Sequence, residues 1–108
     1  MKTNIKSEKL ELTQPIENYL QKKIDSLEKF LNVDDDNLIA YAIVGKTTTH
    51  HVKGNYFKAE IKIKTPRKDF FVQVQKDDLY AAIDEAKDVL KRDIIKYKET
   101  LVDKNQQG

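Results

Sequence analysis

An apolar residue returns every three or four positions through the last third of the chain, over residues 79–101. Side chains at this spacing lie along one stripe of a helix, so the segment predicts an amphipathic α-helix of about 24 residues. Asp77 or Asp78 is expected to cap its start, where a carboxylate accepts hydrogen bonds from unpaired N–H groups. Such a helix needs a second apolar surface to cover its stripe. The stripe consists of Leu79, Ile83, Ala86, Leu90, Ile94, Tyr97 and Leu101.

The second apolar surface is predicted by a strict alternation of apolar and charged side chains over residues 57–64. This pattern is typical of a strand with one face in the core and one face in water. After a turn at 65–69, which Pro66 favours, Phe70, Val72 and Val74 alternate with Phe71, Gln73 and Gln75 and predict the last strand. The apolar run 38–44 is typical of a buried strand, and a short strand is expected near 2–7.

A second amphipathic helix is predicted over residues 14–31. Thr13 and Pro15 are start signals, because a capping hydroxyl and a proline in the first turn both suit a helix N-terminus. The polar run 34–37 is expected to end this helix and to form a loop. The apolar stripe of the helix consists of Ile16, Leu20, Ile24, Leu27 and Leu31.

The expected element order is β-α-β-β-β-α. A sheet with one apolar face needs a cover, and two amphipathic helices supply it. The predicted fold class is therefore α+β, a two-layer sandwich of a four-stranded sheet with two helices on one face. The length of 108 residues suits one domain, which we place at residues 1–102. Residues 103–108 are expected to form a polar, disordered tail.

The composition of the chain excludes several protein classes. There is no cysteine, which rules out a disulfide scaffold and a cysteine-based metal or redox site. The longest uninterrupted apolar run, residues 38–44, is too short to cross a bilayer. The N-terminus lacks the apolar segment of a signal peptide. We therefore expect a cytoplasmic protein with no membrane partner.

Few residues of the chain are suited to catalysis or to metal binding. The three glycines are isolated, which excludes a Gly-rich phosphate loop, and neither serine neighbours a histidine. His50 and His51 would point oppositely on an extended segment, so we expect an exposed loop pair, with an RNA phosphate contact by one imidazole as the alternative. Residues 34–36 lack the later Gly and Glu of a calcium loop. We predict no enzymatic activity, no metal site and no cofactor.

The formal net charge of +2 hides a concentration of basic residues in two segments. Residues 46–68 carry seven basic residues against one acidic residue, and residues 87–98 carry five against two. Clustered lysine is typical of a protein that binds a polyanion. Lysine on strands is also explained by solvation and by protection of a sheet edge from aggregation. The charge counts alone leave both interpretations open.

Basic side chains flank the apolar stripe of each predicted helix. On the first helix, Lys22 and Lys29 lie opposite the stripe and Lys23 lies beside it. On the second helix, ion pairing at a spacing of four, as between Asp88 and Arg92, would account for the cations of the outer flank without any ligand. Ion pairing accounts less well for the lysines of the opposite flank. The flanks consist of Lys87, Lys91 and Lys98 on one side and of Arg92 and Lys96 on the outer side.

Part of the second helix forms a specific signature. It is the run Asp78-Leu79-Tyr80-Ala81-Ala82-Ile83-Asp84, followed by Leu90-Lys91-Arg92-Asp93-Ile94 and Lys96-Tyr97-Lys98. The signature resembles the second helix of the ribosome hibernation promoting factor family, also called ribosome-associated inhibitor A. The start of the chain agrees at Asn4-Ile5, at Glu11-Leu12-Thr13, and at Lys23 with Leu27-Glu28-Lys29-Phe30. The resemblance covers residues 1–102, and that family's β-α-β-β-β-α fold matches the order predicted above.

The resemblance implies a non-enzymatic protein that silences ribosomes. Such proteins bind the 30S subunit and the 70S ribosome, contact 16S rRNA in the decoding and mRNA channel, and block mRNA and tRNA binding. They inhibit translation in stationary phase or stress. Carried over by position, the rRNA-binding residues are Lys22, Lys23, Lys29, Arg92 and Lys96, and the helical wheel adds Lys87, Lys91 and Lys98. Base stacking is not expected, because most aromatic residues fall on core positions.

The sequence departs from that family's pattern at two places. Val89 stands where relatives often have lysine, which would move a contact to Lys87 or Lys91. The central strands carry more lysine than is usual, so Lys62 and Lys64 are expected to add long-range attraction.

The family has a long form that continues into a C-terminal dimerisation domain. A natural short form and the N-terminal part of a long form are both consistent with these residues. A short form would pair ribosomes with the help of a ribosome modulation factor, whereas a long form would pair them through a second copy of itself.

Two other functions follow from the residues when the resemblance is set aside. One is a generic double-stranded-RNA-binding module, which would recognise A-form RNA by its shape. The other is a protein–protein adaptor whose lysines confer only solubility. The resemblance favours ribosome binding over both.

Overall fold

Four strands form a single mixed sheet, in which β1 pairs with β2 in parallel and the other two pairs are antiparallel. The computed structural model describes residues 1–31, 37–47 and 56–107, with side chains through Leu101. The strands lie side by side in chain order and comprise β1 (Lys2–Glu8), β2 (Ile39–Lys46), β3 (Phe57–Lys64) and β4 (Asp69–Lys76).

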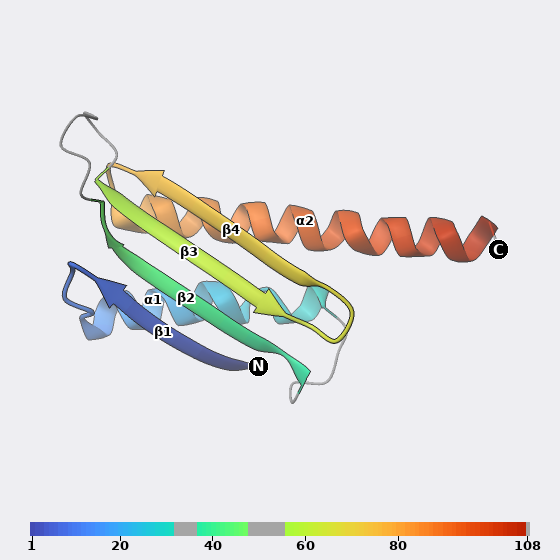
Figure 1. Cartoon of the computed structure of the whole chain (residues 1–108), viewed down its shortest axis with the longest axis horizontal. Coiled ribbons are helices and arrows are strands. Elements are labelled where there is room, and N and C mark those ends of the chain that lie inside the picture. Colours follow the sequence, from blue (N-terminus) through green and yellow to red (C-terminus); the bar gives the residue numbers. More distant parts are fainter. Residues whose placement is uncertain (32–36, 48–55, 108) are drawn as a thin grey trace.

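Two helices cover one face of this sheet. Helix α1 (Gln14–Asp25) lies between β1 and β2 in the chain, within the crossover that a parallel pair requires. Helix α2 (Leu79–Gln107) follows β4 and packs against β3 and β4. Figure 1 shows both helices on the same side of the sheet, with the last turns of α2 extending past its end. The predicted α+β sandwich, with its β-α-β-β-β-α order, is confirmed.

A single apolar core lies between the sheet and the helices. Alternate residues of β2, β3 and β4 point toward the helices and are buried, whereas most of their neighbours face the open side. The stripes predicted for the two helices supply the other half of the core, and burial of this apolar surface is the main stabilising term. The largest fully buried side chains are Leu20, Ile24, Leu27, Leu38, Val44, Ile61, Ile63, Ile83, Leu90 and Ile94.

The first helix is shorter than the predicted 14–31. Helix α1 ends at Asp25, and a short 3₁₀ helix, η1 (Glu28–Phe30), follows it. The hydroxyl of Ser26 donates to the carbonyl of Lys23 at 2.6 Å, and the N–H of Leu27 bonds three residues back rather than four. Serine competes with the helical hydrogen-bond pattern in this way. The prediction of one continuous helix is therefore wrong at this point.

The two helix starts lie where the sequence predicts them. The carboxylate of Asp78 accepts a hydrogen bond from the N–H of Ala81 at 2.9 Å, so Asp78 is the cap of α2. Thr13 occupies the capping position of α1, but its hydroxyl makes no capping bond. The backbone of α2 remains helical through Gln107, past the end of the apolar stripe at Leu101. The domain limit at residue 102 stays a prediction. Disorder of the tail in solution also stays a prediction, and it is consistent with the tendency of exposed helix ends to fray.

None of the helices in the described ranges is both long enough and apolar enough to pass through a membrane.

Strand β1 approaches β2 very closely at Gly45. This residue pairs with Glu8 in the parallel register, and a Cβ placed on Gly45 would lie 2.5 Å from the carbonyl oxygen of Glu8. That separation is far shorter than a van der Waals contact between carbon and oxygen. Glycine therefore allows the end of β1 to pair here.

We predict that Gly45→Ala lowers the free energy of unfolding by about 1–3 kcal/mol, because β1 must shift to relieve the overlap. Urea unfolding followed by circular dichroism measures this change. Lys46→Ala, at the exposed neighbouring position, is the control and is expected to change the free energy by about 0.5 kcal/mol or less. An unchanged midpoint for Gly45→Ala would contradict the close approach of the two strands.

Candidate functional site

All eight helix cations that the sequence nominates lie in the helical layer of the sandwich, on α1, η1 or α2. Contacts between these elements divide them into groups. Some lie where α1 and η1 meet α2, and others project from the outer flank of α2. We call the first region the interhelical surface. It comprises Tyr19, Lys23, Lys29, Phe30, Tyr80, Lys91 and Lys98.

One end of the interhelical surface is held together by an aromatic pair and a shared carboxylate. The rings of Tyr19 on α1 and Tyr80 on α2 meet edge to face, with centroids 4.8 Å apart. The hydroxyl of Tyr19 donates a hydrogen bond to Asp84 of α2. Lys23 Nζ lies 3.4 Å from the same Asp84 oxygen and 5.1 Å from the Tyr19 ring centroid. Asp84 therefore ties α1 to α2 through two side chains.

The shared carboxylate changes the acid–base properties of both partners. The hydrogen bond to Asp84 raises the pKa of Tyr19, with burial and the negative charge adding to the effect. The charge of Asp84 also raises the pKa of Lys23. Lys23 therefore stays positively charged at neutral pH, but part of its charge is already balanced by Asp84.

The other end of the interhelical surface places two lysines beside one ring. Lys29 Nζ of η1 and Lys91 Nζ of α2 each lie 5.2 Å from the centroid of Phe30. A cation is attracted to the face of an aromatic ring, so Phe30 holds both ammonium groups near the junction of the two elements. Both positive charges therefore lie at this junction, where together they attract an anion.

A groove continues from Phe30 along α2. It has a volume of about 370 Å³ and runs between η1, the β3–β4 turn and the C-terminal part of α2. Lys98 and Arg67 border it, while Ile94, Tyr97 and Leu101 supply its apolar floor. The sequence nominates Lys98 but not Phe30 or Arg67 as part of the site. Phe30 is adjacent to Lys29 in the chain, but its contact with Lys91 has no local signal.

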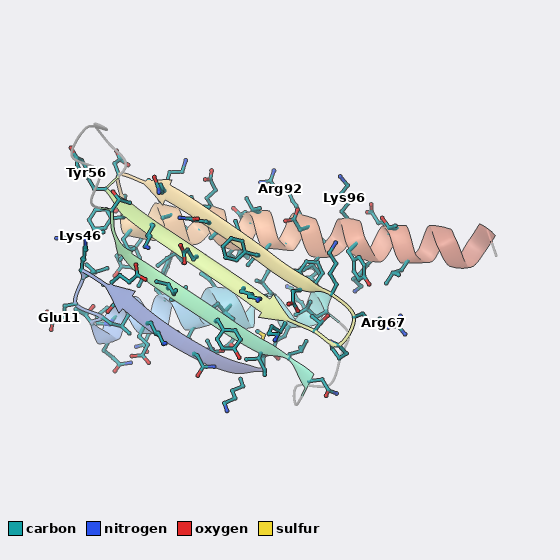
Figure 2. The ribbon with its side chains drawn as sticks, in the orientation of Figure 1. Glu11, Lys46, Tyr56, Arg67, Arg92 and Lys96 are labelled. Carbon is teal, nitrogen blue, oxygen red and sulfur yellow. The ribbon has the colours of Figure 1, made fainter. Side chains whose placement is uncertain are left out.

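The outer flank of α2 carries cations that have no ionic partner in the described part of the chain. Arg92 and Lys96 are exposed and point away from α1, as Figure 2 shows. The carboxylate of Asp88 lies 3.5 Å from Lys87 Nζ, and Asp84 is bound to α1. Ion pairing along α2 therefore does not account for Arg92 and Lys96, contrary to the structural explanation left open by the sequence.

The remaining helix cations differ in availability. Lys22 is exposed on α1, whereas Lys87 is only 20% exposed and is paired with Asp88. The structure thus places Lys23, Lys29, Lys91 and Lys98 along the interhelical surface and separates them from the outer flank. Whether these residues bind RNA stays a prediction.

The two basic segments of the sequence lie mostly on opposite faces of the sandwich. Lys62 and Lys64 alternate with the buried residues of β3 and therefore face away from the helices. Lys62 Nζ lies 3.8 Å from a carboxylate oxygen of Asp69. Lys68, at the β3–β4 turn, is the link between the faces, because its Nζ lies 4.9 Å from the centroid of Tyr97 on α2.

Within residues 1–31, 37–47 and 56–101, no three His, Cys, Asp or Glu side chains gather closely enough to hold a metal ion. His50, His51 and the acidic run 34–36 lie outside the described residues, so the expectations for them stay untested. What the described arrangement offers chemically is anion binding by several cations on a rigid helical layer.

Comparison with known proteins identifies similar sequences. Residues 3–102 match the family model described as Sigma 54 modulation protein / S30EA ribosomal protein. A ribosome hibernation promotion factor from Deinococcus radiodurans is 25% identical over 99 residues, which cover 92% of this chain and 50% of that protein. The protein of the same name from Staphylococcus aureus is 34% identical over 94 residues, which cover 87% of this chain and 46% of that protein. The chain thus spans about half the length of these curated relatives.

Solved structures with the same fold are also known. The N-terminal domain of Thermus thermophilus Protein Y has a TM-score of 0.75 at 28% identity and covers 90% of this chain and 99% of that one. A ribosomal subunit interface protein from Coxiella burnetii has a TM-score of 0.72 at 17% identity, with coverage of 92% and 99%. At that identity, the second likeness supports the fold alone.

We predict that Tyr19→Phe lowers the free energy of unfolding by about 1 kcal/mol at pH 7, because the bond to Asp84 is lost. The pKa of Tyr19 is raised in the folded state, so the native protein binds more protons than the unfolded chain near that pKa. The contribution of the phenol is therefore present below its ordinary pKa of about 10 and is lost as the pH rises through the folded value.

Urea unfolding of both proteins from pH 7 to pH 11 measures this difference. The gap in the free energy of unfolding between wild type and Tyr19→Phe should narrow as the pH rises above about 10. Tyr41→Phe is the control, because its exposed hydroxyl has no hydrogen bond to the described residues. A gap that is constant with pH would contradict the proposed role of the Tyr19 proton.

Proposed function

Because the chain belongs to the Sigma 54 modulation protein / S30EA ribosomal protein family, we propose that it is a ribosome-associated hibernation factor. In the proposed mechanism, the domain occupies the decoding and mRNA channel of the small subunit and its helix cations bind 16S rRNA. The bound domain blocks mRNA and tRNA and so inhibits translation in stationary phase or stress. The proposed partners are the 30S subunit and the 70S ribosome in the cytoplasm. The mechanism needs no chemical step, because occupancy alone inhibits.

The observation that carries this proposal is the pair of ammonium groups beside Phe30. Lys29 and Lys91 come from different elements, and the ring brings each Nζ to 5.2 Å from its centroid. A phosphate is the anion that a folded RNA presents repeatedly along its backbone, and lysine and arginine are its usual protein ligands. A phosphate bound at this junction would be attracted by both lysines.

Arg92 and Lys96 supply further charge to the proposed interface. Neither is neutralised by a carboxylate among the described residues, and both are on a helix whose position is fixed by the core. A guanidinium held on a rigid element suits bidentate contact with phosphate. Lys22 and Lys98 extend the same layer on α1 and α2.

The proposal predicts a strong dependence of ribosome binding on salt. If about five phosphates are neutralised, the logarithm of the association constant falls with the logarithm of salt concentration with a slope of about −4. Co-sedimentation with 30S subunits at several potassium concentrations measures this slope. An association that does not change with salt would exclude phosphate contacts as its main source.

We expect the double variant Arg92→Glu/Lys96→Glu to lose most ribosome co-sedimentation and to reduce the magnitude of the salt slope by about 2, one for each lost contact. Lys9→Glu/Lys46→Glu is the charge-matched control, because both lysines are exposed and neither lies on a helix. Circular dichroism checks that both variants keep the fold. Equal losses in the two variants would indicate a nonspecific effect of net charge.

A competition experiment distinguishes the proposed function from the alternative, a generic double-stranded-RNA-binding module. Plain duplex RNA should displace the protein from 30S subunits poorly if the ribosomal site is the target. Tighter binding to the duplex than to intact 30S subunits would favour the alternative. Retention of a protein partner after nuclease treatment, without ribosome association, would favour an adaptor instead.

A further inference from the structure

The face of the sheet that no helix covers carries a row of aromatic and polar residues. Tyr41 of β2, Lys62 of β3 and Phe71 of β4 are direct neighbours in the strand register, and Asn4 of β1 completes the row. We call these four residues the open-face row. Tyr41 is 41% exposed and Phe71 is 58% exposed. The sequence pattern had suggested that stacking on aromatic rings is unimportant, but it did not account for these two rings.

Both rings of the open-face row are free of aromatic and cation–π contacts with the described residues. Aromatic side chains of the helical layer do make such contacts: Tyr19 pairs with Tyr80, and Phe30 lies beside two lysines. Aromatic residues are favoured in strands mainly because they pack against neighbouring side chains. The exposed rings of the open-face row gain little from such packing. Exposed apolar surface in contact with water is unfavourable, and clustered exposure is typical of a binding site.

Lysines surround the open-face row. Lys2 and Lys64 are the register neighbours of Ile39 on one side of the row, and Lys6 is the neighbour of Ile43 on the other. These three lysines form no ion pair with any residue that the structure describes. Together with Lys62 in the row itself, they give this part of the open face a positive character.

The acidic residues of the open face are already ion-paired. Glu60, a register neighbour of Ile43, lies next to the row, and Glu8, the neighbour of Gly45, lies farther from it. Glu8 lies 2.6 Å from Lys58 Nζ, and Glu60 lies 3.9 Å from the same ammonium group. The hydrogen bond to Glu8 raises the pKa of Lys58, as expected for a lysine that is engaged in an ion pair. Asp69, the register neighbour of Lys64, also lies next to the row, and its carboxylate is 3.8 Å from Lys62 Nζ.

We propose that the open-face row binds a short segment of single-stranded RNA, with one base stacked on Tyr41, another on Phe71, and an intervening phosphate on Lys62. Adjacent strands are about 4.8 Å apart, so the two rings are separated by roughly 10 Å, with the lysine between them. Aromatic rings on a sheet with nearby cations are a common arrangement for unpaired nucleotides. The site is distinct from the helix cations, on the opposite face of the sandwich. This proposal rests on the proposed function only for the source of the RNA, which would be ribosomal RNA or mRNA.

Other ligands fit the open-face row less well. Duplex RNA keeps its base faces stacked inside the helix, so it cannot cover Tyr41 and Phe71. An acidic peptide would pair with the lysines but has no planar groups for the rings. The proposal therefore requires unpaired bases and phosphates together.

The experiment is a binding titration of a fluorescent single-stranded oligoribonucleotide of about ten nucleotides, followed by anisotropy. All proteins carry Arg92→Glu/Lys96→Glu, so that the outer flank of α2 does not contribute to binding. Tyr41→Leu/Phe71→Leu keeps apolar side chains in the strands but removes both rings. It should weaken binding at least about tenfold, because each stacked base contributes several-fold. Tyr41→Phe/Phe71→Tyr keeps two rings and should bind within about twofold of the parent protein.

The salt dependence separates stacking from charge. Lys62→Gln should reduce the magnitude of the salt slope by about 1, whereas the double leucine variant should leave the slope unchanged. The proposal is overturned if the leucine variant binds the oligonucleotide as tightly as the parent. It is also overturned if duplex RNA or polyglutamate competes as well as unlabelled single-stranded RNA. Loss of ribosome binding by the Arg92 and Lys96 variant tests the proposed function separately, since this titration contains no ribosomes.

Discussion

The packing of α2 across β3 and β4 is the interaction on which the rest of the structure depends. The apolar stripe of α2, including the fully buried Leu90, must face the sheet, and this fixes the rotation of the helix about its axis. Each polar position of α2 then has a defined direction. Lys91 faces η1, whereas Arg92 and Lys96 project from the outer flank. The directions of the cations thus follow from the core.

Acidic residues decide which of these cations are available. Asp84 binds Tyr19 and Lys23 across the two helices, and Asp88 binds Lys87 beside it. Had Asp88 paired with Arg92 one turn later, the charge of the outer flank would have been partly cancelled. A chain with a net charge of +2 can therefore present uncompensated cations on one layer, because Asp84 and Asp88 are engaged with other side chains.

Local sequence patterns predicted the helices and strands, but they did not predict contacts between residues that are distant in the chain. Alternation predicted the bounds of β3, and periodicity with a capping carboxylate predicted the start of α2, since both are properties of consecutive residues. The break after Asp25 depends on which acceptor the Ser26 hydroxyl takes, which residue identity alone does not fix. The parallel partner of β1 and the contact of Phe30 with Lys91 depend on the assembled fold, and so does the alignment of the rings on the open face.

The shortest dimension of the domain has an electrostatic consequence. Its principal extent in that direction is 16 Å, about twice the Debye length of roughly 8 Å at physiological ionic strength. Through the surrounding solvent, exposed charges on the helical face and on the open face therefore influence each other only weakly. Under the binding proposed for each face, a ligand on one face would change the potential at the other only slightly. Substitutions can then adjust one face without altering the other.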